Sequence, residues 1–301
     1  MALRTGLLGT GYWARETQGA ALAAHPDVDL VGVWGRDAGR AQALADHLGA
    51  RAYTDVAALI GDVDAVAVAL PPDVQAELAL RAARAGRHLL LDKPVALSGE
   101  AAAALAAEAG RRELASVVFF TMRFSAAMDA FLRETAAAGG WNGAQATLLA
   151  DALRPGSPYS RSPWRRRKGG LWDIGPHALS LLLPVLGPVA EATAVAGPHA
   201  TTHALLRHEG GAVSALALTL DATSAGRRWE FVFHGVNGVV SPPGDAQTPV
   251  AAFTAAIDEL REAVAGGRPS TLDVRFGYEV VRVLEAAQRS VTERRTVPVE
   301  R

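Results

Sequence analysis

An acidic and an imidazole side chain stand four residues apart in the segment GGLWDIGPHAL, residues 169–179. Asp173 and His177 have glycine, proline, tryptophan and leucine as neighbours, and this composition favours burial over solvation. An imidazole exchanges a proton near neutral pH, and a carboxylate can orient it or bind a substrate hydroxyl. The pair is therefore a candidate for acid–base chemistry. Aspartate before a helix is also a favoured N-cap, and one residue can serve both purposes.

A lysine, Lys93, lies in the apolar segment HLLLDKP, residues 88–94. If that segment is a parallel strand, Lys93 lies at its C-terminal end, where open α/β sheets bind ligands. Oxidation of an alcohol needs a proton acceptor and a group that stabilises developing alkoxide. We expect Lys93 to bind the reacting oxygen and His177 to relay the proton, although the two could exchange these roles. The alternatives are a solvated lysine and a structural histidine.

The first 120 residues alternate between short apolar segments and helical segments. This alternation predicts βαβ units and a parallel sheet buried on both faces, which is a doubly wound Rossmann fold of the α/β class. The expected strands cover residues 3–9, 28–35, 64–70, 88–94 and 116–120. The expected helices cover 40–50, 74–86 and 98–110, with Ser98 as an N-cap and Gly49 and Gly86 at helix ends.

The pattern changes after residue 120, which divides the chain into a dinucleotide-binding domain, 1–120, and an α+β domain, 121–301, for substrate binding and dimerisation. Strands that follow one another through glycine turns predict an open, mainly antiparallel sheet. We expect helices over 126–138, 250–265 and 273–290, and strands over 190–197, 203–209, 212–220, 227–235 and 238–243. The apolar segment 178–197 is interrupted by prolines and Glu191, so it predicts a core helix leading into a strand.

The first expected strand runs into Gly9-Thr10-Gly11-Tyr12-Trp13-Ala14, which fits the dinucleotide fingerprint G-x-G-x-x-G/A. The first glycine permits the tight turn, the second lets the backbone approach a pyrophosphate, and the small last residue keeps the helix close to the strand. A plain strand–helix turn is the alternative. The expected cofactor contacts are Gly9, Thr10, Gly11, Tyr12, Trp13, Gly35, Arg36, Leu70, Pro71 and Lys93.

The tip of the second expected strand favours NADP as the cofactor, with NAD as the alternative. Gly35 leaves room for a 2′-phosphate, and the Arg36 guanidinium can pair with it and stack on adenine. An NAD enzyme usually has an acid here that binds both ribose hydroxyls. Asp37 is the only acid nearby, and its position suits a helix cap. Under the alternative interpretation, Arg36 is solvated and Asp37 holds the ribose.

The glycine fingerprint, LLLDKP at 89–94 and GGLWDIGPHAL occur together in an order and spacing that resembles the Gfo/Idh/MocA family of oxidoreductases. The resemblance covers essentially the whole length. It implies NAD(P)-dependent hydride transfer, commonly on sugars or polyols, in a cleft between two domains, and a homodimer or homotetramer formed through the C-terminal sheet. It also implies catalytic roles for Lys93, Asp173 and His177, and often a cis peptide before Pro94.

The sequence departs from the pattern of that family at four positions. Asp92 replaces the usual glutamate, and Lys168 takes the first place of the usual triple glycine. These two changes leave the reaction plausible. Ser180 stands where many members have aspartate, and Gln75 where many have histidine. These two make it unsafe to transfer any particular sugar specificity.

The segment SPYSRSPWRRRKGG, residues 157–170, carries five cationic side chains and is expected to be either a solvated loop or a contact for a phosphate or carboxylate. In the second case Arg165 or Lys168 reaches the anion and Trp164 packs on a ring. The expected substrate contacts are Lys93, Arg123, Trp164, Arg165, Asp173 and His177.

The composition narrows the classes of partner. The formal net charge of −1 argues against nucleic acid, and no apolar segment is long enough to suggest a membrane span. The absence of cysteine excludes disulfides and thiol nucleophiles, and the eight histidines show no spacing typical of a metal site. We expect a cytoplasmic enzyme with a small-molecule substrate and no metal. Glycoside cleavage with tightly held NAD and an inactive NADP-binding sensor are the alternative functions.

Overall fold

Six parallel strands form the first sheet of the computed structural model, which describes residues 2–244 and 247–300. Their order, β3-β2-β1-β4-β5-β6, is that of a doubly wound Rossmann sheet and confirms the predicted fold. The strands are β1 (Leu3–Leu8), β2 (Val28–Trp34), β3 (Arg51–Tyr53), β4 (Ala65–Val68), β5 (His88–Asp92) and β6 (Ser116–Phe119). Every residue of β4 and β6 is buried, as expected where helices cover both faces.

The helices of this sheet begin and end largely where the sequence predicts. Asp37 and Ser98 cap α2 and α5 through their side chains, and Gly49 ends α2 with a positive φ. The connecting helices are η1, a π-helical segment (Ala14–Gly19), α1 (Ala20–Ala24), α2 (Ala38–Leu48), α3 (Val56–Asp62), α4 (Pro72–Arg84), α5 (Gly99–Arg111) and the 3-10 helix η2 (Thr121–Phe124).

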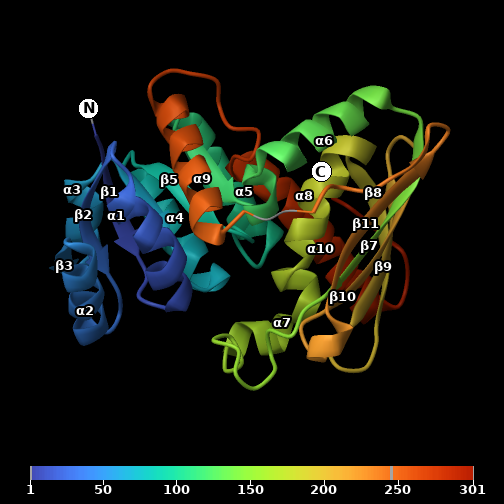
Figure 1. Ribbon diagram of the computed structural model, residues 1–301, viewed down its shortest axis with the longest axis horizontal. Helices are drawn as coiled ribbons and strands as arrows, with labels where there is room; N and C mark the ends of the chain where they lie inside the picture. The colour runs from blue at the N-terminus through green and yellow to red at the C-terminus, as the bar shows by residue number, and fades with distance from the viewer. Residues whose placement is uncertain (1, 245–246, 301) are drawn as a thin grey trace. The chain divides into compact units, whose positions relative to one another are not determined.

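The described residues fall into two units, and the first unit includes a segment from late in the sequence. It combines the described residues of Met1–Phe124 with Gln247–Tyr278. Helix α9 (Pro249–Val264) therefore lies among the helices of the N-terminal unit, as Figure 1 shows, and Phe253 packs edge-on against Phe119 of β6 with ring centroids 4.8 Å apart. The predicted division at residue 120 assigns 247–278 to the second domain, whereas the structure places this segment with the first.

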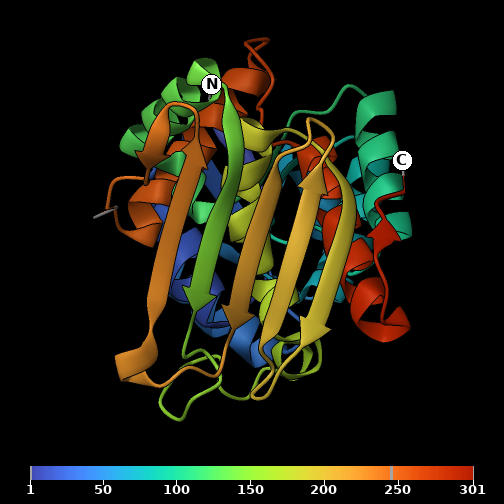
Figure 2. The same ribbon diagram turned by 90° about the vertical axis from the view of Figure 1, so that its right-hand side faces the viewer.

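The second unit combines the described residues of Ser125–Ala246 with Glu279–Arg301 and contains a seven-stranded sheet of order β12-β11-β7-β10-β9-β8-β13. Figure 2 shows the face of this sheet on which no described helix of the unit lies. The pairing is antiparallel except between β7 and β10, so the sheet is mixed and mostly antiparallel. The strands are β7 (Trp141–Leu149), β8 (Val189–Ala196), β9 (Thr202–His208), β10 (Val213–Thr219), β11 (Arg228–Gly235), β12 (Gly238–Val240) and β13 (Val297–Pro298).

The other face of the second sheet packs on helices. Leu148 of β7 and Leu218 of β10 are fully buried there, and α8 lies against both strands. The helices are α6 (Ala126–Ala138), α7 (Pro163–Asp173), α8 (Gly175–Leu186), the 3-10 helix η3 (Ser224–Gly226) and α10 (Val274–Glu293), whose first turn belongs to the first unit. Part of the expected loop 157–170 is thus helical from Pro163 onward. Among the described residues, no helix combines the length and apolar character that a membrane span requires.

Candidate active site

The glycine turn between β1 and η1 has the geometry that the fingerprint requires. Gly9 has φ +136°, and a Cβ atom there would lie 2.4 Å from the Ala69 carbonyl oxygen, so no larger residue fits without movement. A Cβ atom at Gly11 would meet no described atom within 4 Å. The backbone at Gly11 is thus open to a ligand, at the start of helical residues 12–24, where free N–H groups favour a phosphate.

The next two residues of the fingerprint differ in their surroundings. Tyr12 is 54% exposed. The Trp13 ring lies 6.4 Å from the Phe119 ring, and its Nε1 atom is buried without a hydrogen-bond partner among the described residues. A buried N–H group without an acceptor is uncommon in a finished structure and suits a position beside a ligand or water. Leu70 and Pro71, which follow β4, are partly buried, and Pro71 is the N-cap of α4.

At the tip of β2, Gly35 is closely packed. A Cβ atom at this position would lie 2.6 Å from Cγ2 of Thr10, so a larger residue fits only if the Thr10 side chain moves. Asp37 caps α2, because its Oδ1 accepts a hydrogen bond from the Arg40 N–H at 3.0 Å. Arg36 is exposed and makes no hydrogen bond or ion pair with another described residue.

Lys93 follows β5, and a buried glutamine holds the backbone on both sides of it. Gln75 Nε2 donates to the carbonyl oxygens of Asp92 at 2.7 Å and Pro94 at 3.0 Å, and Gln75 Oε1 accepts from the Asp92 N–H at 2.9 Å. The Lys93 N–H donates to Asp92 Oδ1 at 2.8 Å. The Lys93–Pro94 peptide is cis, as the family resemblance implies.

In the second unit, a break within α7 places Asp173. Gly169 interrupts the helix with φ +64°, and a Cβ atom at Gly170 would lie 2.9 Å from the β10 backbone. Asp173 is the last residue of α7, and Ile174 is the N-cap of α8. The alternative prediction that Asp173 caps the following helix is therefore wrong, because one residue separates it from the start of α8.

Arg165 approaches Asp173 instead of solvent. Its Nε donates to Asp173 Oδ2 at 2.8 Å, and these two side chains are only 19% and 8% exposed. The guanidinium carbon also lies 4.3 Å from the Tyr159 ring centre and 4.6 Å from that of Trp164. Contact of a planar cation with two aromatic rings, together with a hydrogen bond to a carboxylate, restricts its orientation. Lys168 of the same segment lies over the Trp172 ring, with Nζ 4.7 Å from its centre.

His177 lies in the first turn of α8 and is 8% exposed. Its ring is 5.6 Å from that of Trp229 on β11, at an interplanar angle of 66°. Its backbone carbonyl accepts from the Ser180 hydroxyl at 2.8 Å, so Ser180, at the position where many family members have aspartate, binds within its own helix. Within the second unit, the structure thus brings Trp164, Arg165 and Asp173 together and sets His177 against Trp229.

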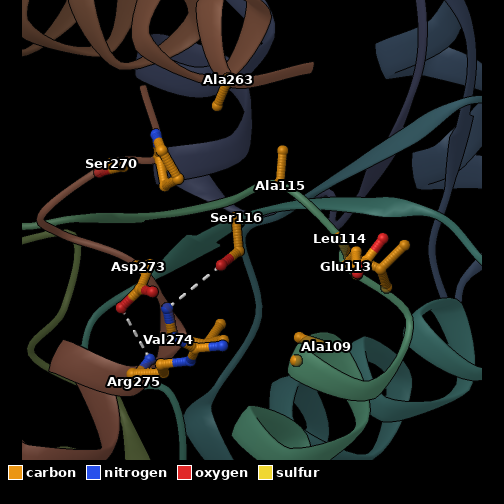
Figure 3. A pocket seen from close by; sticks show the side chains of 12 residues that line it. Ala109, Glu113, Leu114, Ala115, Ser116, Ala263, Ser270, Asp273, Val274 and Arg275 are labelled. Atoms are coloured by element: carbon orange, nitrogen blue, oxygen red, sulfur yellow. Dashed lines mark hydrogen bonds between the residues drawn. The ribbon is translucent and has the colours of Figure 1, made fainter. Parts of the chain in front are cut away.

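Arg123 lies in η2 of the first unit and is partly buried. The cavity of about 350 Å³ in Figure 3 also belongs to the first unit, but it lies at the N-terminal end of β6 between α5 and the start of α10. None of its lining residues is a predicted site residue. Its polar groups are engaged locally, since Ser116 Oγ accepts from the Val274 N–H and Asp273 caps α10. In the described part of the chain, no cluster of three or more acidic or histidine side chains forms a metal site.

Two family models match the chain. Residues 3–120 match that of an oxidoreductase family with an NAD-binding Rossmann fold, and residues 132–241 match the GFO/IDH/MocA C-terminal domain. The chain belongs to the GFO/IDH/MocA oxidoreductase family. It is an NAD(P)-binding oxidoreductase of this type. The first match lies within the first unit and the second match within the second unit.

Relatives match this GFO/IDH/MocA protein along nearly its whole length. It is 29% identical to UDP-N-acetylglucosamine 3-dehydrogenase of Acidithiobacillus ferrooxidans, with 95% of each chain covered. It is 25% identical to inositol 2-dehydrogenase of Rhizobium meliloti, which covers 99% of this chain and 100% of that protein. Among solved structures, GenD2 from gentamicin A biosynthesis, crystallised with NAD, superposes with a TM-score of 0.88 at 23% identity and covers 100% of this chain and 97% of its own.

Two features of the site are not evident from the sequence: the role of Gln75 and the pairing of Arg165 with Asp173. Gln75 falls on the buried face of α4 together with Ala79 and Ala82, at helical spacings of four and seven. A glutamine at such a position needs internal hydrogen bonds, and this was the signal that could have identified it. The contact of Arg165 with Asp173 depends on the break in α7 at Gly169, and the hydrophobic periodicity of the sequence does not predict that break.

Proposed function

We propose that this family member transfers a hydride between a nicotinamide cofactor and a carbon atom of a sugar, polyol or related compound. The observation that carries this proposal is the pairing, within one unit, of an open glycine turn at the end of β1 with a rigidly held Lys93 at the end of β5. Both lie at the C-terminal edge of a parallel sheet, where ligands of such sheets bind.

The residues of the first unit would hold the cofactor. Gly9, Thr10 and Gly11 would cradle the pyrophosphate, and Tyr12, Trp13, Leu70 and Pro71 would line its path. The open space at Gly11 and the unpartnered Trp13 N–H group fit a bound dinucleotide. When bound, the nicotinamide supplies the hydride donor or acceptor.

The protein itself supplies proton transfer and orientation of the substrate. The Lys93 ammonium group would donate a hydrogen bond to the reacting oxygen and stabilise negative charge that develops there. His177 would accept the proton as the alcohol is oxidised and return it in the reverse direction, or exchange this role with Lys93. Asp173 would bind a neighbouring hydroxyl, with Trp164, Arg165 and Arg123 as further substrate contacts. This arrangement requires Lys93 and His177 to meet the same substrate.

NADP is the proposed preferred cofactor, and NAD is the alternative. Asp37 is already used as a helix cap, so it is a poor candidate for holding both ribose hydroxyls. Arg36 is exposed, without a described partner, and its guanidinium suits a 2′-phosphate. Gly35 adds little to this choice, because its close packing against the Thr10 side chain is a structural reason for a glycine there.

The direct test is a turnover assay on two substrates that the names of the relatives suggest: UDP-N-acetylglucosamine and myo-inositol. Each is incubated with NAD⁺ and with NADP⁺, and reduced nicotinamide is followed at 340 nm. We expect net reduction with at least one pair, and a loss of turnover of about 100-fold in Lys93→Met and in His177→Ala. Full activity in both variants would contradict the assigned roles.

We further propose that two copies associate through the open face of the second sheet. A row across this face, read from the strand register, is Thr193, Leu205, Ala215, Gln145 and Val232. These side chains are small, apolar or uncharged, and Leu205 is 54% exposed. The row itself is uncharged, and the exposed Glu191–Arg207 ion pair lies beside it on the same face. An uncharged row with charged residues at its side suits an isologous contact, which gives a homodimer or, with a second contact, a homotetramer.

A further inference from the structure

Gln75 is fully buried, and all three described hydrogen bonds of its side chain go to the backbone around Lys93. They join α4 to the segment that leaves β5. One carbonyl it binds belongs to Asp92, directly before Lys93, and the other to Pro94, directly after it.

A single buried amide can do this because it carries both donors and an acceptor on one planar group. The Asp92 N–H needs an acceptor, and the two carbonyl oxygens need donors, once they are buried away from water. A carboxylate could bind only the N–H, and an alkyl chain could bind none of the three. The requirement for this residue type therefore comes from the backbone of residues 92–94.

From this geometry we infer that Gln75 is the positioning residue for Lys93: it fixes the backbone from which the reactive amine extends. The catalytic importance of Lys93 rests on the proposed function. The effect of Gln75 on the position of Lys93 does not depend on it. Gln75 does not touch the reacting atoms in this account. It acts through the orientation of Lys93, and a small displacement of a group that binds a reacting atom costs much of its effect.

The test compares Gln75→Met, which has a similar length but makes none of the three hydrogen bonds, with Ser116→Ala. Ser116 is also buried in the first unit and also binds a backbone N–H, that of Val274, but it lies at the opposite end of the parallel sheet. Both variants lose a buried side-chain-to-backbone contact, so both are expected to lower the melting temperature. If Gln75→Met does not fold, Gln75→Asn gives the same comparison with a shortened amide.

The first readout needs no substrate, because the chain has only two lysines, Lys93 and Lys168. Trace labelling with acetic anhydride, followed by peptide mass spectrometry, gives the reactivity of the Lys93 amine relative to Lys168 as an internal reference. Lys93 is partly buried, so release of its segment is expected to raise this ratio by about tenfold, a factor comparable to the loss of one hydrogen bond. Ser116→Ala should leave the ratio unchanged. A ratio equally unchanged in Gln75→Met would overturn the inference.

The second readout is kcat with the substrate and cofactor that the turnover assay identifies. Gln75→Met is expected to lower kcat by about 10- to 100-fold with the KM for cofactor nearly constant. In a Lys93→Met background the same change should have little further effect, because its effect passes through the missing amine. If the loss of kcat in the double variant equals the product of the losses in the two single variants, the inference is overturned and the proposed function still stands. A different outcome is that Lys93→Met keeps full activity while Gln75→Met shows altered labelling of Lys93. That result would support the positioning role of Gln75 and refute the proposed catalytic role of Lys93.

Discussion

The Arg165 guanidinium binds the Asp173 carboxylate at 2.8 Å, and its central carbon lies 4.3 Å and 4.6 Å from the ring centres of Tyr159 and Trp164. The sequence predicts either a solvated loop here or a contact of Arg165 or Lys168 with a phosphate or carboxylate. The carboxylate that Arg165 reaches in the structure is a side chain of the same α7 segment. Arg165 therefore fixes the position of Asp173, and any contact with substrate must use the remaining guanidinium N–H groups.

Replacing Arg165 with methionine should lower both stability and activity. The substitution removes a charged hydrogen bond to a carboxylate that is 8% exposed, so the free energy of unfolding should fall by about 2 kcal/mol. Turnover should fall as well, because Asp173 loses the group that orients it. Arg165→Lys should recover little, since an ammonium cannot reproduce the planar stacking. Denaturant unfolding and steady-state kinetics check both effects, and wild-type kinetics in Arg165→Met would refute the orienting role.

Replacing each of the two fingerprint glycines with alanine should affect a different property: stability at Gly9 and cofactor affinity at Gly11. At Gly9 the new Cβ atom would lie 2.4 Å from the Ala69 carbonyl oxygen at a φ of +136°, so Gly9→Ala should destabilise the first unit by about 2 kcal/mol or more. At Gly11 the space is open, so Gly11→Ala should fold normally but bind cofactor about tenfold more weakly, because the methyl group occupies the path of the pyrophosphate. Thermal unfolding and titration of reduced-nicotinamide fluorescence separate the two effects. Tight cofactor binding by Gly11→Ala would argue against the glycine turn as the binding site.

The proposed preference for NADP is tested at Arg36. Arg36→Gln removes a side chain that is exposed and has no described partner, so stability should change by no more than about 0.5 kcal/mol. Affinity for NADPH should fall about tenfold or more, on the scale of one lost charged hydrogen bond, while affinity for NADH stays nearly constant. Fluorescence titration with each cofactor provides the measurement. Equal changes for both cofactors would show that Arg36 does not bind a 2′-phosphate.

The proposed association through the second sheet is tested at Leu205. An exposed leucine tolerates glutamate within a monomer, but a charge on the buried part of an interface is strongly unfavourable. Leu205→Glu should therefore shift the protein to monomers in light scattering coupled to size exclusion, with little change in secondary structure. Val236→Glu, at an 80% exposed position outside the open-face row, is the matched control. Monomeric wild-type protein at micromolar concentration would refute the association itself.

Much of the first unit could be predicted because its signals are local. The apolar strands, the caps at Asp37 and Ser98 and the turn at Gly49 depend on neighbouring residues, and the structure has all of them. The same holds for α6 and for the sequence of strands from β8 to β12.

The features that the sequence did not reveal depend on contacts between distant segments. Strand β7 contains Gly143 and several alanines, so its alternation is weak, and its parallel place beside β10 follows from the sheet as a whole. Helix α9 belongs to the first unit, where Phe253 packs on Phe119, and the periodicity of the sequence does not predict that contact. The pairing of Arg165 with Asp173 and the contacts of Gln75 with Asp92 and Pro94 are of the same kind.

Acid should destabilise the protein in part through His208. This histidine is 1% exposed, with Nδ1 2.7 Å from the Gly187 carbonyl oxygen and Nε2 3.0 Å from Ser214 Oγ. Burial lowers the pKa of His208 below its ordinary value, and the hydrogen bond to Gly187 opposes this in part. As the pH falls below about 6.5, the unfolded chain binds a proton that the native imidazole does not yet accept. Stability contributed by neutral His208 is therefore present above that pH and is lost as the pH falls from it toward the lower native pKa.

His208→Gln removes this titration and keeps a donor and an acceptor, so its melting temperature should fall less than that of the wild type between pH 7.5 and 5. The variant will be less stable than the wild type at neutral pH, because glutamine fills the site less well. The quantity to compare is therefore the change in melting temperature between pH 7.5 and pH 5 in each protein, and not the melting temperature at one pH. His47→Gln, at an exposed position in α2, is the matched control and should follow the wild type. Equal pH-dependent losses in all three proteins would exclude His208 as a source of acid sensitivity and leave His88, whose pKa burial also lowers, as the next histidine to replace.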